Sequence, residues 1–314
     1  EIWMPGKELR RHSLHFGGEL QVTSHPATAA EMLPDGWSQQ WRVLRFIPTS
    51  GSSNLIQAIN KVSVDKNGNF MEQCRSCLLM PYTKSIVSAV MSALVMVQAP
   101  SFFDDSGQRE LRILCVGFGG GSIPSFFIEM LPHCRVDVVE LEAEVVEASK
   151  DVGFQRDPRI SITVQDGAIF AQDAITLHAD AAYDAVIIDA YDADGNVPET
   201  FSSDGPFLEA LAAGLLAKRS VLVTNFLPQT DLAPVLHRQA EALSNQGSCL
   251  SFAIQAEGSG NLLALHLCGA SMRSASKAEL MLRLWLAART VERDVPACPF
   301  RISRLAVKGL REIQ

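Results

Sequence analysis

The fold of this chain is decided by the stretch Val116-Gly117-Phe118-Gly119-Gly120-Gly121-Ser122. It follows the apolar run 111–116 and precedes the segment 123–131, so it predicts a strand, a glycine-rich turn and a helix in succession. Glycine lets the backbone turn tightly and approach a ligand closely, and the start of a helix presents free N–H groups. A glycine-rich turn can also serve packing alone, so the interpretation needs further signals.

Toward the C-terminus, strands and helices are expected to alternate. The expected strands are 135–141, 160–164, 185–189 and 220–226, and the helices are about 143–150, 203–216 and 231–245. This alternation predicts a parallel sheet with helices on both faces, and the continuously apolar run 185–188 fits two-sided burial. The runs 249–255 and 262–268 flank a Gly-rich segment and predict a terminal antiparallel hairpin. The predicted fold class is α/β, with a Rossmann-like sheet.

The N-terminal part is expected to differ from this pattern. Residues 1–108 are predicted to form a small β-rich accessory region with a helix, and residues 109–314 the sheet domain. The expected strands are 41–47 and 56–64, with turns at 49–53 and 65–69, and the helix spans about 83–97. The polar segment 104–110 marks the expected boundary, and a further helix is predicted at about 277–289.

Bulk properties exclude several classes of protein. The chain has 314 residues, 47% of them hydrophobic and 20% charged, as in ordinary globular proteins. Its net charge of −8 argues against a nucleic-acid partner held by a basic field. The longest apolar run, 86–97, is too short to span a bilayer, and residues 1–16 lack an apolar leader run. We therefore expect a cytoplasmic protein with neither a nucleic-acid nor a membrane partner.

Cysteines and histidines give no pattern typical of a metal site. The seven cysteines are odd in number and scattered, which indicates a reducing compartment. Cys74 and Cys77 form a CxxC without a second pair or a nearby histidine. We expect a structural role for this pair, with redox or metal use as the alternatives. The histidines outside the first 25 residues occupy separate elements without metal-ligand spacing: His133, His178, His237 and His266.

An acidic residue ends the strand after the glycine turn. Glu140 lies 23 positions after Gly117, and a carboxylate there can accept hydrogen bonds from both ribose hydroxyls of an adenosine-containing cofactor. Glu142 and Glu144 are nearby competitors for that role. The position of Glu140 as the last polar group of the strand favours it.

The third strand is followed by Gln165-Asp166-Gly167-Ala168. Asp166 can accept a hydrogen bond from an adenine amino group, and Gly167 would let the ring lie against the backbone. Asp-Gly is also common in ordinary turns, which is the alternative. The binding role is favoured because open α/β sheets bind ligands at the carboxyl ends of their strands.

The loop after the fourth strand is strongly acidic. Asp189, Asp192 and Asp194 lie within six residues, and no Lys or Arg occurs between residues 160 and 217. This local negative field would attract a sulfonium cofactor and a cationic amine, and would repel phosphates. We expect Asp189 to orient or deprotonate the amine and Asp192 to help hold its charge. The accessory region and the segment around Tyr82 are expected to cap the crevice.

On these motifs, residues 111–189 resemble the spermidine-synthase-like branch of class I S-adenosyl-L-methionine-dependent methyltransferases. The similarity is greatest to the methyltransferase domain of the enzymes that act on translation elongation factor 1-alpha. The resemblance implies S-adenosyl-L-methionine as cofactor and a homodimer. It also implies that six residues contact the cofactor or lie beside the reacting centre: Gly117, Gly119, Gly121, Glu140, Asp166 and Asp189. We further expect Phe118, Leu141, Gly167 and Ala168 to bind the cofactor, and Asp189 and Asp192 to be catalytic.

The chain departs from the aminopropyltransferases of the same branch. They carry an Asp where this chain has Gly120, and Ala193 and Asn196 replace two prolines of their strand-four loop. We therefore predict methyl transfer to an amine, on a protein or a small molecule. The alternatives are an aminopropyltransferase and a non-catalytic interaction module. A nicotinamide enzyme is disfavoured by the terminal hairpin and by Asp166-Gly167.

Overall fold

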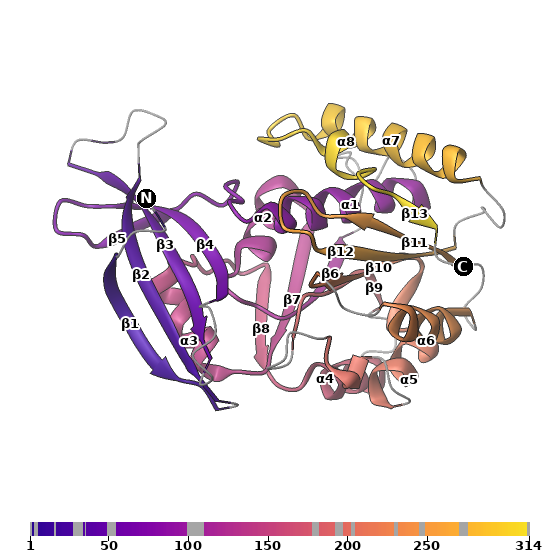
Figure 1. Cartoon of the computed structure of the whole chain (residues 1–314), viewed down its shortest axis with the longest axis horizontal. Coiled ribbons are helices and arrows are strands. Elements are labelled where there is room, and N and C mark those ends of the chain that lie inside the picture. The colour runs from indigo at the N-terminus through magenta and orange to yellow at the C-terminus, as the bar shows by residue number, and fades with distance from the viewer. Residues whose placement is uncertain are drawn as a thin grey trace.

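The computed structural model contains two β-sheets joined by helices (Figure 1). It describes residues 2, 6–15, 17–27, 34, 36–48, 55–98, 110–177, 182–191, 197–201, 205–228, 232–244, 249–269 and 276–312. The predicted turn at 49–53 and the boundary segment as far as residue 109 lie outside the described residues.

The N-terminal sheet is antiparallel, with its five strands in chain order. They are β1 (Lys7–Ser13), β2 (Glu19–Ala27), β3 (Ser38–Ile47), β4 (Leu55–Val64) and β5 (Phe70–Gln73). Strands β3 and β4 confirm the two predicted runs. Strands β1, β2 and β5 were not predicted. The residues of β1 are mostly exposed and polar, so they lack the apolar alternation that marks a half-buried strand.

The large sheet has the strand order β13-β11-β12-β10-β9-β6-β7-β8. Strands β8, β7, β6, β9 and β10 pair in parallel, while β12 pairs antiparallel with both β10 and β11. This arrangement confirms the predicted parallel sheet with a terminal antiparallel hairpin. The strands are β6 (Leu111–Val116), β7 (Cys134–Glu140), β8 (Ile160–Val164), β9 (Tyr183–Ile188), β10 (Leu216–Phe226), β11 (Cys249–Gln255), β12 (Leu262–Cys268) and β13 (Arg311–Glu312).

Helices cover both faces of this sheet, and each face has its own core. Alternate residues of β6 divide between the two cores: Ile113 and Cys115 face one, and Leu114 and Val116 the other. Because both faces are buried, the central strands are apolar throughout. One face carries α1 (Pro81–Gln98), α2 (Ser122–Met130), α7 (Lys277–Asp294) and α8 (Ile302–Leu305), and the other carries α4 (Gly167–Leu177), α5 (Pro206–Ala213) and α6 (Ala233–Ser244).

Several predicted boundaries were wrong by a few residues; helix α7, for example, continues to Asp294 beyond its predicted end at about residue 289. The helix predicted at 203–216 ends at Ala213, because Gly214 takes the left-handed conformation that terminates helices. Strand β10 then begins at Leu216 rather than at residue 220. Helix α4 was not predicted, since its start coincides with the Asp166-Gly167 turn.

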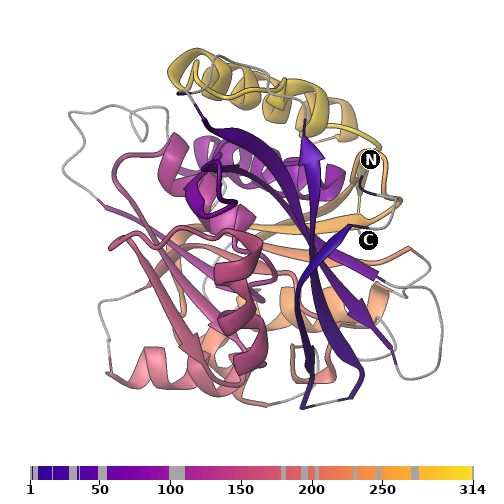
Figure 2. The same ribbon diagram turned by 90° about the vertical axis from the view of Figure 1, so that its left-hand side faces the viewer.

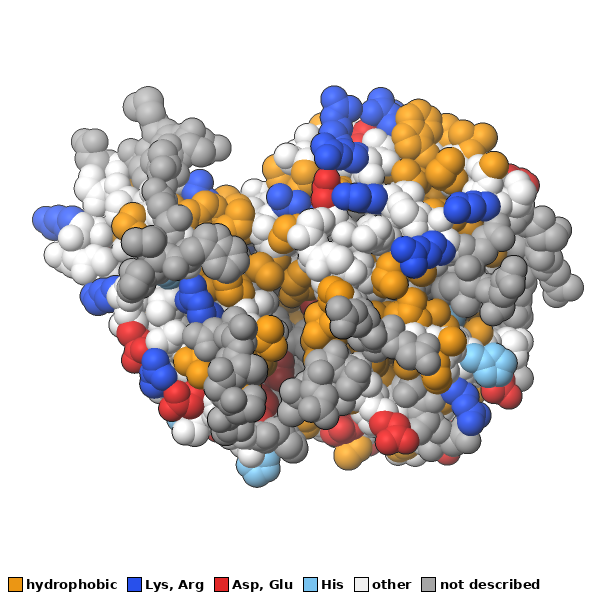
Figure 3. Space-filling model, viewed as in Figure 1, with side chains coloured by type: hydrophobic (Ala, Val, Ile, Leu, Met, Phe, Trp, Pro, Cys, Tyr) orange, Lys and Arg blue, Asp and Glu red, His pale blue; other side chains and the backbone are white. Residues whose placement is uncertain are grey.

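Helix α1 is enclosed between the large sheet and the C-terminal helices. It packs against β10, α7 and α8, and its serines Ser85, Ser88 and Ser92 are fully buried. This position confirms the predicted buried helix. No helix within the described ranges combines the length and apolarity needed to cross a membrane. In Figure 3, exposed hydrophobic side chains gather over α7, where Met281, Leu282, Trp285 and Leu286 lie at the surface.

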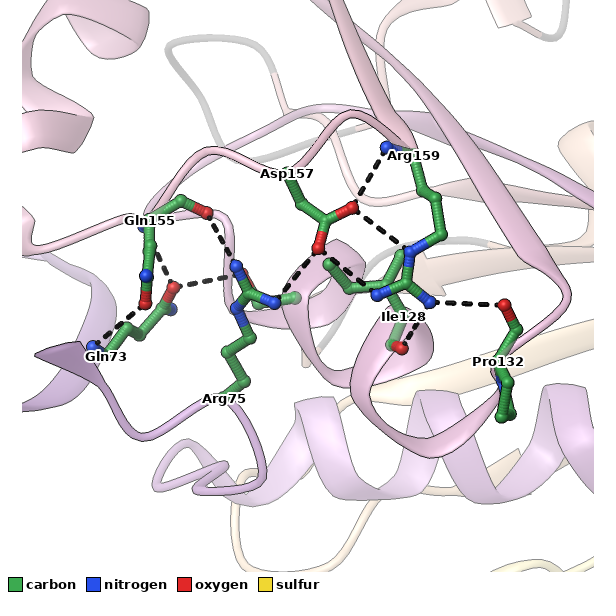
Figure 4. A network of polar contacts seen from close by, with 8 residues as sticks. Gln73, Arg75, Ile128, Pro132, Gln155, Asp157 and Arg159 are labelled. Atoms are coloured by element: carbon green, nitrogen blue, oxygen red, sulfur yellow. Dashed lines mark hydrogen bonds and ion pairs between the residues drawn. The ribbon is translucent and has the colours of Figure 1, made fainter.

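The N-terminal sheet packs against α3 (Ala143–Val152), which contacts β1, β2 and β3 (Figure 2). A second junction is polar. Gln73 exchanges hydrogen bonds with Gln155, and Arg75 pairs with Asp157 at 3.0 Å (Figure 4). These contacts hold the end of β5 against the segment that leads into β8.

Candidate ligand site

The glycine turn joins the ends of three neighbouring strands. Gly117 donates its N–H to the Val139 carbonyl, and Asp189 donates its N–H to the Val116 carbonyl, both at 2.9 Å. A Cβ on Gly117 would lie 2.4 Å from the carbonyl oxygen of Asp189, and its φ is +95°. Glycine is therefore required here for both space and conformation. The predicted residues Gly117 and Asp189 are in direct backbone contact.

The next part of the turn leads into α2 and lies under the N-terminal sheet. Gly121 precedes α2 with φ 70°. Asn60 of β4 donates a hydrogen bond to the Gly120 carbonyl at 2.8 Å. A Cβ on Gly120 would lie 2.5 Å from the Cβ of Ala58, and one on Gly119 would lie 3.9 Å from the Gln57 carbonyl oxygen. Strand β4 therefore forms one wall over the glycine turn.

Glu140 is held in place by backbone groups. The Phe118 N–H donates to Oε2 at 2.9 Å, and the Glu142 N–H donates to Oε1 at 3.0 Å. Burial raises the pKa of Glu140, and these backbone donors oppose the shift. The carboxylate is thus oriented beside Phe118 of the turn. The expected competitor Glu142 contributes its backbone N–H to this arrangement.

Asp166 begins α4. Its Oδ1 accepts the N–H groups of Ala168 at 2.8 Å and Ile169 at 3.1 Å, which is the geometry of a helix N-cap. Both of these bonds go to one oxygen, so Oδ2 can still accept from a ligand. The Gln165 N–H donates to the Glu140 carbonyl at 3.0 Å, which holds this corner beside the end of β7.

Gly167 and two apolar side chains lie at the same corner. A Cβ on Gly167 would lie 3.0 Å from both Phe201 and Val116, so the backbone there is closely packed from behind. Leu141 and Ile169 are each 49% exposed. Apolar surface of this kind at the carboxyl end of a parallel sheet suits a flat ring of a ligand.

Asp189 lies within a network of buried polar groups. Asn225, near the end of β10, donates from Nδ2 to Oδ1 of Asp189 at 2.8 Å. Asn261 in turn donates to the side-chain oxygen of Asn225 at 3.1 Å. Burial raises the pKa of Asp189, and the hydrogen bond from Asn225 opposes the shift. Asn225 therefore fixes one oxygen of the carboxylate and leaves the other for a ligand.

Two tyrosines face this carboxylate. The Tyr82 hydroxyl donates to the Gln57 carbonyl at 3.4 Å, and the Tyr191 hydroxyl is buried without a well-formed hydrogen bond to the described residues. Burial raises the pKa of both phenols, and the negative charge of Asp189 adds to the effect. A buried tyrosine hydroxyl beside a buried carboxylate is an arrangement that suits a ligand site.

The structure therefore brings together most of the residues predicted from sequence. Asp192 is the exception, because residues 192–196 lie outside the described residues. Tyr191, Asn225 and Asn261 were not predicted from sequence, and Tyr82 was assigned only to a capping segment. The end of the predicted strand 220–226 is a signal that could have identified Asn225, since it lies at the same edge of the sheet as Asp189. Among the described residues, no cluster of His, Cys, Asp or Glu could hold a metal ion.

Comparison with known proteins shows which curated sequences this chain resembles. No family model matches this chain. Over 110 residues it is 28% identical to the eEF1A lysine and N-terminal methyltransferase of Xenopus laevis, an alignment that covers 35% of this chain and 15% of that protein. Curated spermidine synthases and a polyamine aminopropyltransferase are also similar, and the chain spans half or less of the length of each of these relatives.

Solved structures show the same fold. Human methyltransferase-like protein 13 in complex with SAH superposes with a TM-score of 0.51 at 20% identity, covering 68% of this chain and 92% of that one. A probable spermidine synthase from Corynebacterium glutamicum gives a TM-score of 0.56 at 16% identity, covering 98% and 95%. The expected resemblance to spermidine-synthase-like class I methyltransferases is confirmed.

Proposed function

We propose that this chain is an S-adenosyl-L-methionine-dependent methyltransferase that acts on an amine. The observation that carries the proposal is the buried Asp189 carboxylate, which lies against the backbone of Gly117 at the edge of the sheet where Glu140 also lies. Carboxylates beside bare backbone suit a positively charged adenosyl compound. The similarity to methyltransferases that act on eEF1A supports the same activity.

The residues at the glycine turn fit this cofactor. Glu140 is held by two backbone N–H groups, so its remaining lone pairs can accept hydrogen bonds from ribose hydroxyls. Gly117, Phe118, Gly119 and Gly121 would line the cofactor with backbone rather than bulky side chains. S-adenosyl-L-methionine supplies an activated methyl group when bound, so the protein's contribution is alignment and electrostatics.

The corner at Asp166 fits an adenine ring. Leu141 and Ile169 are half-exposed apolar side chains, and a ring between them would bury surface that is otherwise in water. Oδ2 of Asp166 would accept from the amino group of the ring. Gly167 and Ala168 would lie against the ring edge.

The acceptor amine would bind at the Asp189 network. Asn225 holds Oδ1, so the other carboxylate oxygen can accept a proton from the amine or hold its charge. The Tyr191 hydroxyl lies beside this carboxylate, and its oxygen can accept a hydrogen bond from a protonated amine. Asp192 is proposed to help hold the charge of the amine. The names of the relatives that act on eEF1A favour an amine on a protein over a small molecule.

The aminopropyltransferase alternative is disfavoured by Gly120. An Asp at this position would place its Cβ 2.5 Å from the Cβ of Ala58 and 3.1 Å from Val152. Strand β4 therefore occupies the space in which the Asp of the aminopropyltransferases would lie.

The proposal is tested with the purified chain by two measurements. Calorimetry with S-adenosylhomocysteine should give saturable binding. Labelled S-adenosyl-L-methionine incubated with an extract should then transfer label to an acceptor that mass spectrometry identifies. Binding of neither compound would refute the proposal and leave an interaction module. Formation of spermidine from putrescine and decarboxylated S-adenosylmethionine would establish the aminopropyltransferase instead.

The cellular location, the oligomeric state and the division of the chain into two regions are also proposed. A cytoplasmic location is supported by the seven free cysteines, which suit a reducing compartment. A homodimer is expected from the resemblance and is measured by light scattering. We also propose an accessory region, residues 1–108, and a methyltransferase domain, residues 109–314. Expressing residues 109–314 alone tests whether that domain folds by itself.

A further inference from the structure

Cys74 and Cys77 form a pair of thiols in a tight turn between β5 and α1. The Cys77 N–H donates to the Cys74 carbonyl at 3.0 Å, so the four residues 74–77 form a hydrogen-bonded β-turn. Such a turn brings its first and last Cα atoms within about 7 Å. A disulfide requires a Cα separation of about 4.4–6.8 Å. The backbone is therefore already close to the geometry that a disulfide needs.

The two thiols differ in their surroundings. The Sγ of Cys74 lies 3.8 Å from the Ser76 hydroxyl, and the Cys77 thiol stands at the other end of the same turn. The neighbouring Cys77 thiol is the largest influence that lowers the pKa of Cys74, and the charge of Lys61 assists. The neighbouring Cys74 thiol and burial raise the pKa of Cys77. One sulfur is thus a ready nucleophile and the other keeps its proton.

The remaining cysteines either lack a partner thiol or are less accessible, although Cys249 and Cys268 show the same opposed pKa shifts, upward for Cys249 and downward for Cys268. Cys115 and Cys134 are buried, and burial raises the pKa of both thiols. Cys298 is a half-buried single thiol whose pKa is also raised by burial. Cys249 and Cys268 face each other across strands β11 and β12, but Cys268 is only 4% exposed. Both members of the 74–77 pair are half-buried and can be reached from solvent.

The turn is anchored by Arg75, one of the two residues between the cysteines, and by Gln73, the residue before them. Arg75 pairs with Asp157 at 3.0 Å, and Gln73 accepts hydrogen bonds from Ser125 and from the Gln155 N–H (Figure 4). Because these contacts reach α2 and the segment before β8, the turn is held in one conformation. A held turn keeps the two sulfurs close, which favours an internal disulfide over a bond to another molecule.

We infer that Cys74 and Cys77 form a reversible thiol–disulfide site that reacts with hydroperoxides. The Cys74 thiolate attacks a peroxide oxygen, so an S–O bond forms, the O–O bond breaks and an alcohol or water leaves after protonation. The Cys77 sulfur then attacks the sulfur of the Cys74 sulfenic acid, so the S–S bond forms and water leaves with the Cys77 proton. The two thiols lose two electrons, which the peroxide gains, and a dithiol reductant reverses the change.

The site is tested by treating the reduced full chain with hydrogen peroxide and digesting it with trypsin. Cleavage after Arg75 separates the cysteines, so a 74–77 disulfide appears as two peptides joined until dithiothreitol is added. In Cys77→Ser, a sulfenic acid should accumulate on Cys74 and be trapped by dimedone. In Cys74→Ser, dimedone should label Cys77 little or not at all. These results do not depend on the proposed methyl transfer.

The Cys298→Ser variant is the matched control, and its 74–77 disulfide should form as in the wild type. Before oxidation, Cys74 should react with iodoacetamide at neutral pH about fivefold faster than Cys298, since its higher thiolate fraction outweighs its lower intrinsic nucleophilicity. The inference is overturned if 74 and 77 stay reduced while the 249–268 pair oxidises. It is also overturned if dimedone labels Cys77→Ser and Cys74→Ser equally.

Discussion

Substituting Gly117 by alanine tests whether the glycine turn and the Asp189 strand end form one rigid unit. A non-glycine residue at a φ of +95° costs about 1–3 kcal/mol in backbone strain. The added Cβ would also meet the Asp189 carbonyl oxygen at 2.4 Å, so the two chain segments must separate by about 1 Å to reach ordinary contact.

That separation weakens two buried backbone hydrogen bonds, from Gly117 to Val139 and from Asp189 to Val116. Each is worth about 1 kcal/mol, so Gly117→Ala should lower the free energy of unfolding by about 3–5 kcal/mol. Gly214→Ala is the matched control, because Gly214 also has a positive φ, 111°, but nothing lies within 4 Å of its Cβ position. The control should lose only the strain, about 1–3 kcal/mol.

Urea denaturation followed by tryptophan fluorescence measures the free energy of unfolding of both variants. The two values can be compared if the m-values are unchanged. We expect Gly117→Ala to be less stable than Gly214→Ala by about 2 kcal/mol. Equal losses in the two variants would refute the contact. S-adenosylhomocysteine affinity should fall for Gly117→Ala and stay unchanged for Gly214→Ala.

Three further substitutions probe the site. Asp189→Asn keeps an acceptor for Asn225 but should lower turnover by about 10²–10⁴-fold while S-adenosylhomocysteine affinity by calorimetry stays within a few-fold. Because burial raises the folded-state pKa of Asp189, its protonated form stabilises the fold at low pH, and this contribution is lost as the pH rises through that pKa. Asp189→Asn should therefore gain stability relative to the wild type as the pH rises from about 4, and parallel pH–stability curves would contradict this. Glu140→Ala should weaken S-adenosylhomocysteine binding by about 1.5–3 kcal/mol by calorimetry, and undiminished affinity would remove it from the site. Gly120→Ala should destabilise the chain, because its Cβ would meet the Cβ of Ala58. Adding Ala58→Gly should restore about 1–3 kcal/mol of the free energy of unfolding in urea denaturation. Additive effects of the two substitutions would show that β4 does not lie against Gly120.

Much of the large sheet could be predicted because its signals are local. Strand 111–116 and the hairpin 249–255 and 262–268 have the predicted bounds, since continuous apolar runs and glycine turns act through neighbouring residues. Glu140 and Asp189 could be selected because strand ends at one edge of a parallel sheet meet. The N-cap role of Asp166 was not foreseen, since helix α4 begins within the residues interpreted as a turn.

The contacts between distant segments were not visible in the sequence. Tyr82 and Asn261 come from a helix start and a hairpin, and only folding brings them to Asp189 and its partner Asn225. No periodicity relates such positions, because their proximity depends on how the helices and both sheets pack.

The sequence by itself determined the layered α/β architecture, the glycine turn and the two acidic strand ends, because each follows from the steric and burial preferences of residues close together in the chain. Only the tertiary structure decided which side chains surround the Asp189 carboxylate and that β4 covers the glycine turn. Those outcomes depend on the packing of segments far apart in sequence, and the raised pKa of Asp189 follows from the burial that this packing creates.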